Sequence, residues 1–433
     1  MTAPQGTPEH RAAHRWTVGV LVVFAMLGTG FGSWLSRLPA VRDQLGASTL
    51  EMSVFGLSLA LGSVLGLLFS GRTVTWLGPQ RTLAVGVIGQ AVAMPAAVGL
   101  FWLGAIVPAV ACLAIYGVMF ATSDVSMNVS GAAAERALGK PRMPLFHAAY
   151  SLGSVSSMGL GALSEALRLP VPVHLTAIFA LIAVVVLIAL RAIPNTAHHS
   201  EPEDVPPLTA LTGPIPIVSQ LQADSSSGVP TEPPPAQRPL PAARPYTPWR
   251  DPRILIIGLI AMSMSFAEGT ASDWLPLALA DGRGFTNEAA TLTLGAFFVS
   301  MTLTRIAGSW LLTRFGRVTV LRTGALLVAL GVVVTILVPV GWANIVGTVL
   351  WGVGCAFGFP IGISAAADNP RTAVRDVAAV SAIAYTAMLL GPMLIGFLGE
   401  HFGLLPAFWP LVGFAAIAFF FAGTAREPER AAA

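Results

Sequence analysis

Two groups of polar side chains lie inside long apolar runs of this chain, where charged groups are costly. The first group contains Asp124, Asn128 and His147. A charge at the centre of a membrane-spanning helix costs about 2.5–3.5 kcal/mol on insertion scales, so its presence indicates a function. The spacing of Asp124 and Asn128 places them on one face of a helix, and we expect His147 at a similar depth. Such a group suits the binding of a polyol and the exchange of a proton.

Each member of this group also has a structural interpretation. Asp124 would serve equally as a hydrogen-bonding carboxylate within a helix bundle. Asn128 is as typical of a polar contact between helices as of a ligand contact. His147 fits a residue at the cytoplasmic boundary as well as a residue of a pore.

The second group contains Glu268, Asp273 and Arg305. Glu268 lies deep in its apolar run, and a carboxyl group in such surroundings suits reversible protonation. Glu268 is therefore a candidate for proton coupling or substrate binding. Asp273 is either a solvated helix end or part of a pathway. Arg305 is either an anchor for the loop that follows it or the charge partner of a substrate or an acid.

Three aromatic side chains accompany these groups, namely Trp34, Tyr150 and Trp274. Sugars stack on such rings. Tryptophan and tyrosine also gather at membrane interfaces, so an aromatic belt is an equally good explanation.

The elements that must position these residues are apolar runs. Hydrophobic residues make up 55% of the 433 residues and charged residues only 10%, whereas soluble domains carry about 25% charged residues. A membrane-spanning helix needs about 20 apolar residues. Pro360 and Pro392 predict kinks in the tenth and eleventh runs. The twelve runs that qualify are 16–36, 51–71, 83–102, 106–128, 144–165, 172–191, 253–276, 288–311, 320–340, 343–366, 376–398 and 404–423.

These runs predict an all-α membrane protein of two six-helix bundles separated by a proline-rich segment. Segment 194–250 holds 14 of the 33 prolines and has too little apolar surface to order itself. It is predicted as a disordered linker, with a small regulatory domain as the alternative. The predicted divisions are an N-terminal tail (1–15), a first bundle (16–193), the linker, a second bundle (251–424) and a C-terminal tail (425–433).

Loop charges predict the orientation. With the N-terminus inside, the inner segments hold 19 Lys and Arg residues and the outer loops hold 4. Positive residues collect on the cytoplasmic side. We therefore expect both tails and the linker in the cytoplasm of a bacterial-type inner membrane.

The two halves also match each other along the chain. Their order and near-constant spacing indicate a parallel repeat, which places a solute path between the halves. The matched pairs are Trp34 with Trp274, Asp43 with Asp281, Gly46 with Gly284, Gly78 with Gly316, Tyr150 with Tyr385, Gly161 with Gly396 and Glu165 with Glu400.

On these features the chain resembles the major facilitator superfamily, whose loop after the second span usually reads Gly-x-Leu-Ala-Asp-Arg-x-Gly-Arg-Arg. Stretch 309–317 is a fair copy, and the resemblance implies gating roles for its residues. Both copies carry threonine, Thr75 and Thr313, where the superfamily has the acid that helps to lock the inner gate. The gating residues implied are Gly71, Gly78 and Arg81 in the first half and Arg314, Gly316 and Arg317 in the second.

A narrower resemblance rests on about twenty residues. Stretch 123–128 is similar to the acid-x3-Asn stretch of fucose and sugar:proton symporters, and His147 stands where that branch has a sugar-binding glutamine. Ala267-Glu268-Gly269 and the stretch 273–276 look closest to uncharacterised bacterial permeases of the YbjJ type. The span 1 acid that fucose permease uses for coupling is missing here, since the matching stretch is 32–35.

The sequence therefore predicts a secondary transporter of a small sugar- or metabolite-like solute that works by alternating access, is driven by a proton gradient and needs no cofactor or metal. A phosphate-binding Gly-x4-Gly-Lys loop is absent from the sequence, so ATP is excluded as the direct energy source. A proton-exchanging exporter and a transport-dead sensor remain alternatives. The absence of a nucleophile elbow and of a His-rich cluster argues against an enzyme. The partners expected are the solute and the lipid bilayer, without nucleic acid, and the chain is expected to be a monomer.

Overall fold

The computed structural model describes residues 8–138, 142–194, 247–369 and 372–427. Secondary structure in these ranges is helical, and the predicted all-α membrane protein of two six-helix bundles is confirmed. Most of the predicted linker and the outer parts of both predicted tails lie outside the described residues. The last part of the predicted linker, Pro248–Arg250, forms a short 3-10 helix, η2.

The first half contains six long helices. They are α1 (Pro8–Leu45), α2 (Thr49–Leu77), α3 (Pro79–Trp102), α4 (Ile106–Leu138), α5 (Met143–Ala166) and α6 (Val171–Ala189), followed by η1 (Leu190–Ala192). The second half contains α7 (Pro252–Arg283), α8 (Asn287–Ile306), α9 (Gly308–Leu337), α10 (Gly341–Cys355), α11 (Gly358–Ala366), α12 (Ala373–Phe402), η3 (Pro406–Phe408), α13 (Trp409–Phe421) and η4 (Ala422–Ala425).

Eleven helical segments in the described residues are long and apolar enough to cross a membrane, with α10 and α11 counted as one segment. The remaining member of the predicted twelve is α5, whose 24 residues include five serines, His147 and Tyr150. This helix packs on α1 and α8. Its polarity is therefore directed largely toward other helices.

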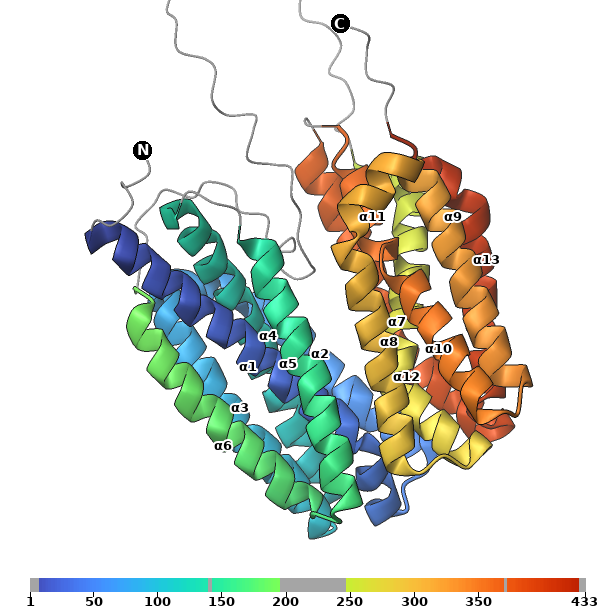
Figure 1. The fold of residues 1–433 in the computed structure, drawn as a ribbon, viewed down its shortest axis with the longest axis horizontal. Coiled ribbons are helices and arrows are strands. Elements are labelled where there is room, and N and C mark those ends of the chain that lie inside the picture. The colour runs from blue at the N-terminus through green and yellow to red at the C-terminus, as the bar shows by residue number, and fades with distance from the viewer. Residues whose placement is uncertain (1–7, 139–141, 195–246, 370–371, 428–433) are drawn as a thin grey trace, which may run out of the picture.

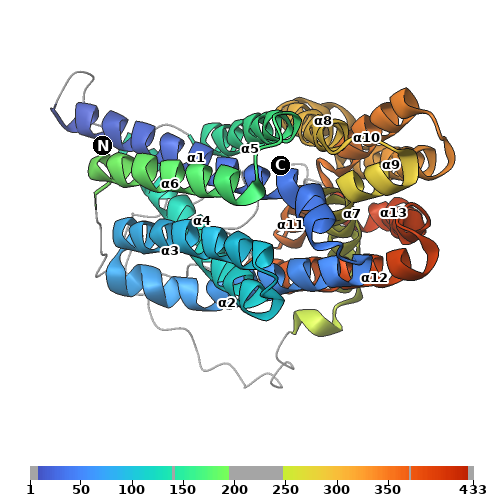
Figure 2. The ribbon, with the colours of Figure 1, turned by 90° about the horizontal axis from the view of Figure 1, so that it is seen from below.

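The two halves lie side by side (Figures 1 and 2). Helix α5 of the first half packs on α8 of the second, and α2 packs on α12. The ribbons of the two halves diverge toward the end where α1 begins and η4 ends (Figure 1). At the opposite end, which the loop charges predict to be the outer end, α1 and α12 reach the other half.

The predicted repeat recurs in the backbone. Gly46 and Gly284 both end a helix with a left-handed conformation, at φ 57° and 66°. Gly78 and Gly316 both adopt φ near 80° and 73° with ψ of 157° and 162°, a region that is essentially restricted to glycine. The chain therefore turns in the same way at the matched positions of each half.

Several helices extend beyond the predicted runs: α1 begins at Pro8 within the predicted N-terminal tail, α4 continues to Leu138, and α9 begins at Gly308. Helix α1 continues to Leu45 and thus includes Arg37 and Arg42, which the hydropathy pattern placed in an outer loop. The tenth run breaks between α10 and α11 just before Pro360, as a proline that lacks an N–H predicts. Helix α12, by contrast, runs through Pro392 as one element.

The glycine turns lead to a stability prediction. We expect Gly78→Ala and Gly316→Ala each to lower the free energy of unfolding by about 1–3 kcal/mol, because alanine is strained at these angles. Thermal unfolding of the purified protein in detergent measures this. Gly71→Ala is the matched control, since Gly71 lies inside α2 and no atom lies within 4 Å of the added Cβ. Equal unfolding temperatures for Gly316→Ala and Gly71→Ala would contradict the prediction.

Candidate functional site

Two of the predicted residues, Glu268 on α7 and Arg305 on α8, form an ion pair with an N–O distance of 3.1 Å. About a third of each side chain is exposed. The Nε of Arg305 also donates to the backbone oxygen of Ala356 at 3.0 Å. Of the two roles predicted for Arg305, the structure thus shows the charge partner of an acid.

The contact between Arg305 and the Ala356 carbonyl depends on a proline, Pro360. In a regular helix the N–H of residue 360 would donate to the carbonyl of Ala356, but Pro360 has no N–H. The carbonyl of Ala356 lies in the break between α10 and α11, where Arg305 takes the free oxygen. The kink predicted from Pro360 therefore helps to position the Arg305 guanidinium beside Glu268.

Asp124 and Asn128 have separate roles in this conformation. The Asn128 side-chain amide is buried and donates to the backbone oxygen of Asp124 at 2.9 Å, so this donor is used within α4. The Asp124 carboxylate is half-buried. In the described residues it has no hydrogen bond or ion pair with another side chain, and the same holds for Asp273 on α7.

Tyrosines from both halves approach Asp124. The hydroxyl groups of Tyr150 on α5 and Tyr385 on α12 lie close enough to Asp124 for electrostatic interaction. The hydroxyl groups of Tyr116 and Tyr385 are buried and have no hydrogen-bond partner within the described ranges. Tyr150 and Tyr385 are matched positions of the repeat, so the two halves contribute equivalent hydroxyl groups.

His147 lies on α5, one turn before Tyr150. Its ring packs edge-on against Phe24, with 5.2 Å between ring centroids, and it interacts electrostatically with Arg305 of the second half. The structure thus brings His147 and Arg305 near each other across the two halves.

The two tryptophans of the predicted aromatic set do not line this region. Trp34 is 5% exposed and Trp274 is 2% exposed, and both belong to the hydrophobic core. The indole N–H of Trp274 has no partner among the described residues. Burial of both rings leaves no open face for a sugar, so stacking on Trp34 or Trp274 is not possible in this conformation.

The implied gating loops have unequal contacts. Arg317 donates to Asp368 at 2.8 Å and to the Ser364 hydroxyl at 2.9 Å, and Arg253 binds the same carboxylate at 2.8 Å. Asp368, which follows α11, thus provides a carboxylate to this loop. Thr313, at the position of the superfamily's acid, donates to a carbonyl of its own helix at 2.7 Å.

The first-half copy has simpler surroundings. The Thr75 hydroxyl donates to the Gly71 carbonyl within α2, as threonine commonly does in helices. Gly78 provides the positive-φ turn into α3. Arg81 and Arg314, one in each half, are exposed.

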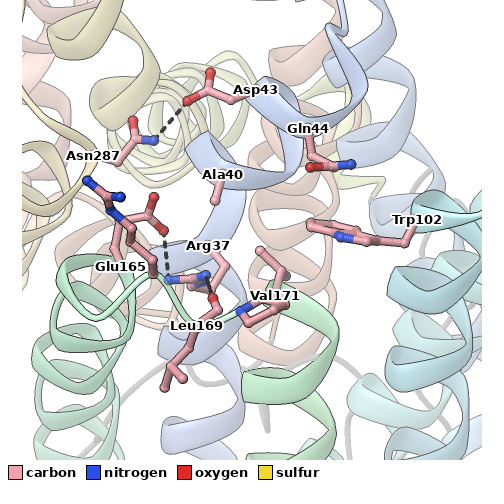
Figure 3. Close-up of a pocket in the computed structure, with 11 residues that line it drawn as sticks. Arg37, Ala40, Asp43, Gln44, Trp102, Glu165, Leu169, Val171 and Asn287 are labelled. Atoms are coloured by element: carbon pink, nitrogen blue, oxygen red, sulfur yellow. Dashed lines mark hydrogen bonds and ion pairs between the residues drawn. The ribbon is translucent and has the colours of Figure 1, made fainter.

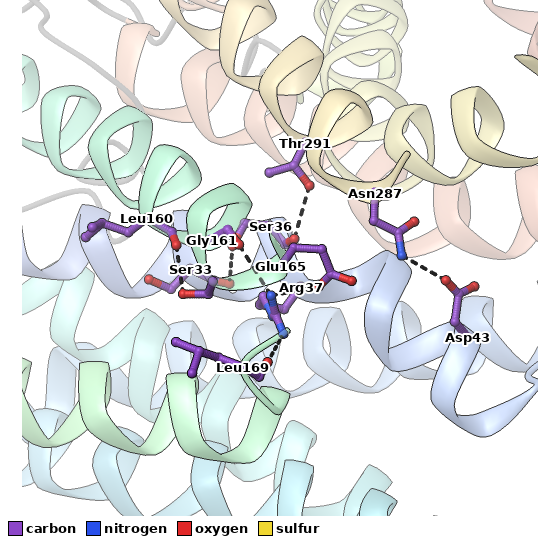
Figure 4. Close-up of polar contacts among 11 residues, drawn as sticks. Ser33, Ser36, Arg37, Asp43, Leu160, Gly161, Glu165, Leu169, Asn287 and Thr291 are labelled. Atoms are coloured by element: carbon purple, nitrogen blue, oxygen red, sulfur yellow. Dashed lines mark hydrogen bonds and ion pairs between the residues drawn. The ribbon is translucent and has the colours of Figure 1, made fainter. Parts of the chain in front are cut away.

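The sequence reasoning missed a charged network near the predicted outer end (Figure 4). Arg37 is 2% exposed, forms an ion pair with Glu165 at 2.7 Å and donates to the Leu169 carbonyl at 2.6 Å. These contacts tie α1 to the end of α5 and to the loop before α6. The matched pairs Gly161 with Gly396 and Glu165 with Glu400 are the sequence signals in this network.

Neighbouring contacts join the two halves at this end. Arg42 pairs with Asp281, and the Asn287 amide donates to Asp43 at 2.8 Å. The Thr291 hydroxyl donates to the Ser36 carbonyl at 3.1 Å. The Leu50 N–H donates to Glu400 at 3.2 Å. Within the described residues, all hydrogen bonds and ion pairs that involve side chains and join the two halves are these four contacts, which we call the outer latch.

A cavity of about 340 Å³ adjoins the outer latch (Figure 3). Its polar lining combines Arg37 and Glu165 with Asp43 and Asn287, and Trp102 lies on its far side. One residue of the second half, Asn287, contributes to it. The cavity therefore belongs mainly to the first half.

Comparisons with known proteins agree with this architecture. The family model of the Major Facilitator Superfamily matches residues 141–375 and 257–433. An uncharacterised transporter of Sinorhizobium fredii, y4wD, is 29% identical over 390 residues, which cover 88% of this chain and 90% of the relative. The nucleoside transporter NupG superposes with a TM-score of 0.69 at 16% identity, over 94% of this chain and 98% of its own. A variant of the E. coli fucose:proton symporter FucP gives a TM-score of 0.56 at 14% identity, over 95% and 98%. At these identities the two structures show a shared fold.

The buried Arg37 network leads to a prediction. We expect Arg37→Ala to lower the free energy of unfolding by about 3–5 kcal/mol, because it leaves the Glu165 carboxylate without its partner. Thermal unfolding in detergent measures this, and the double variant Arg37→Ala/Glu165→Ala should recover part of the loss. Arg168→Ala is the control, since Arg168 is exposed and lines the same cavity. Similar losses for Arg37→Ala and Arg168→Ala would refute the structural role of the ion pair.

Proposed function

Because the chain belongs to the major facilitator superfamily, we propose that it takes up a polyhydroxylated solute, sugar- or nucleoside-like, together with protons. The chain is a transporter of small solutes and not an enzyme. The proposal concerns the solute, the coupling and the direction. It needs no cofactor beyond the proton gradient, and it describes a monomer without nucleic acid.

The Glu268–Arg305 ion pair carries the coupling part of the proposal. A carboxylate can be neutralised either by a guanidinium or by a proton, but a protonated Glu268 loses most of its attraction for Arg305. Proton binding would therefore release Arg305 from α7 while the Ala356 carbonyl still holds it to the tenth span. Such a change in pairing links proton binding to a rearrangement of α7 against α8 and α10.

Unpaired tyrosine hydroxyl groups of the interior support the polyhydroxylated solute. Tyr116 and Tyr385 have buried hydroxyl groups without protein partners in the described ranges, and an unpaired buried polar group is destabilising. A solute with several hydroxyl groups would supply the missing partners. Proteins of the same fold include the nucleoside transporter NupG and the fucose:proton symporter FucP, which handle such solutes.

The outer latch supports alternating access. The side-chain hydrogen bonds and ion pairs that join the two halves in the described residues gather at one end, and the same end would have to open when the solute path changes sides. The loop charges support an orientation with this end outside and both termini in the cytoplasm, and the proposal places the chain in an inner membrane.

A transport assay tests the coupling. In proteoliposomes with a pH-sensitive dye inside, we expect one member of a panel of hexoses, pentoses and nucleosides to drive proton influx. Glu268→Gln should reduce gradient-driven accumulation of that solute at least tenfold while solute exchange survives, because the amide cannot be reversibly protonated. Glu51→Gln is the matched control, since Glu51 is exposed in the capping box of α2 and glutamine fills that role as well.

The outcomes of this assay separate the alternatives. Proton efflux on solute entry would identify an exchanger, which is the chemistry of an exporter. Full accumulation by Glu268→Gln would exclude Glu268 as the coupling group. If no member of the panel drives proton movement, the proposed solute class is refuted.

Thiol labelling tests the outer latch and the orientation together. In a variant without Cys112 and Cys355, we expect Gln44→Cys to react with a membrane-impermeant maleimide added outside intact cells, because Gln44 is exposed beside the cavity. Ser36→Cys should be protected, since Ser36 is 4% exposed. Adding Arg42→Ala should raise labelling of Ser36→Cys severalfold, because Asp281 then loses its partner.

Two results would count against this view. Labelling of Gln44→Cys only after permeabilisation would reverse the orientation. Unchanged labelling of Ser36→Cys on adding Arg42→Ala would show that the Arg42–Asp281 pair does not hold the two halves together.

A further inference from the structure

One face of α4 carries aromatic rings that lead to a carboxylate. Tyr116, Phe120 and Asp124 follow one another at intervals of four residues, so they lie on the same face of the helix at steps of about 6 Å along its axis. The rings of Tyr116 and Phe120 stack with 6.1 Å between centroids. The Asp124 carboxylate thus continues an aromatic stripe.

A second set of rings stands opposite this stripe. Phe31 of α1 lies 6.0 Å from Phe120, 6.3 Å from Tyr150 and 6.4 Å from Phe298 of the second half, measured between ring centroids. Phe31, Phe120 and Tyr150 are all half-buried. Each of the three residues therefore keeps part of its surface exposed, and four helices from both halves contribute to this aromatic cluster.

Asp124 differs in its surroundings from two other acids of the interior, Glu268 and Glu165. Glu268 has Arg305 and Glu165 has Arg37. Arg305, which interacts with His147 from the second half, is already engaged, since it binds Glu268 and Ala356. The groups that interact electrostatically with the Asp124 carboxylate include the hydroxyl groups of Tyr150 and Tyr385, which carry no positive charge.

An unpaired carboxylate beside several aromatic rings has a specific chemical preference. The faces of aromatic rings attract cations, and the carboxylate provides a charged hydrogen-bond acceptor for an ammonium group. A neutral sugar would stack on the rings but would leave the carboxylate without a counter-charge, and an anionic solute would be repelled by it.

We propose that the solute carries a protonated amine, which binds between the Asp124 carboxylate and the rings of Phe31, Phe120 and Tyr150, while its hydroxyl groups reach Tyr150 and Tyr385. This inference rests on the proposed function, since it names the subclass of polyhydroxylated solute as an amino sugar or a similar amino polyol. It assigns recognition of the positive charge of the solute to Asp124, whereas proton coupling remains the role of Glu268.

Equilibrium binding to the purified full chain in detergent tests this without any gradient. The probes form two matched sets. In the first set the amine is D-glucosamine and its neutral partners are D-glucose and N-acetyl-D-glucosamine. In the second set the amine is N-methyl-D-glucamine and its neutral partner is D-sorbitol. Calorimetry at pH 6.5 keeps the amines protonated. We expect the amine of at least one set to bind about tenfold or more tightly than its neutral partners.

Variants identify the groups responsible. Asp124→Asn should abolish the preference for the amine and leave neutral binding nearly unchanged. Phe120→Leu keeps the bulk of the side chain but removes the ring, and we expect it to weaken amine binding about fivefold. Glu51→Gln is the control, since Glu51 is exposed in the capping box of α2, and it should keep the full preference.

Each result decides the proposal. Equal binding of amine and neutral probes, binding by no amine probe, or an amine preference that survives Asp124→Asn overturns it. The proposed function fails on different evidence, because a preference for amines with no proton movement in proteoliposomes would refute coupling and leave the amine site standing.

Discussion

Hydrocarbon offers no hydrogen bonds, and this constraint accounts for most of the polar contacts in the structure. Each polar group in a membrane interior must find a partner within the protein or bear a cost of several kcal/mol. Serines and threonines meet the constraint locally, as Thr75 and Thr313 do by donating to carbonyls of their own helices. Arg37 meets it through Glu165 and two backbone carbonyls.

The same constraint connects a proline to the proposed coupling pair. Pro360 frees the Ala356 carbonyl, and Arg305 satisfies that carbonyl while it pairs with Glu268. The helix break thus leaves a backbone carbonyl free to accept a hydrogen bond from the arginine side chain. Groups that do not meet the constraint stand out against this background, and the buried hydroxyl groups of Tyr116 and Tyr385 are examples among the described residues. These are the groups that a bound solute would satisfy.

The repeat is preserved in the backbone and altered in the charges. Gly78 and Gly316 make equivalent turns, because the main-chain path of each half requires the same angles. The matched acids behave differently. Glu165 is held by Arg37 within the first half, whereas Glu400 reaches across to the Leu50 N–H of the other half. Glu400 can therefore contribute a hydrogen-bond acceptor to the outer latch.

The sequence alone determined the number of long helices, the division into two halves and the glycine turns, because these depend on hydropathy and local backbone geometry, which act over a few residues. It also marked Glu268, Arg305, Asp124 and Tyr150, since polar groups are conspicuous in apolar runs. Partners were decided only by the tertiary structure. The pairing of Glu268 with Arg305, the burial of Trp34 and Trp274, and the extension of α1 past Arg37 all depend on which helices pack together. The hydropathy pattern ends the first span just before Arg37 because it treats every arginine as exposed. Contacts with Glu165 and Leu169, which are far away in the sequence, allow the charge of Arg37 to remain buried in the protein.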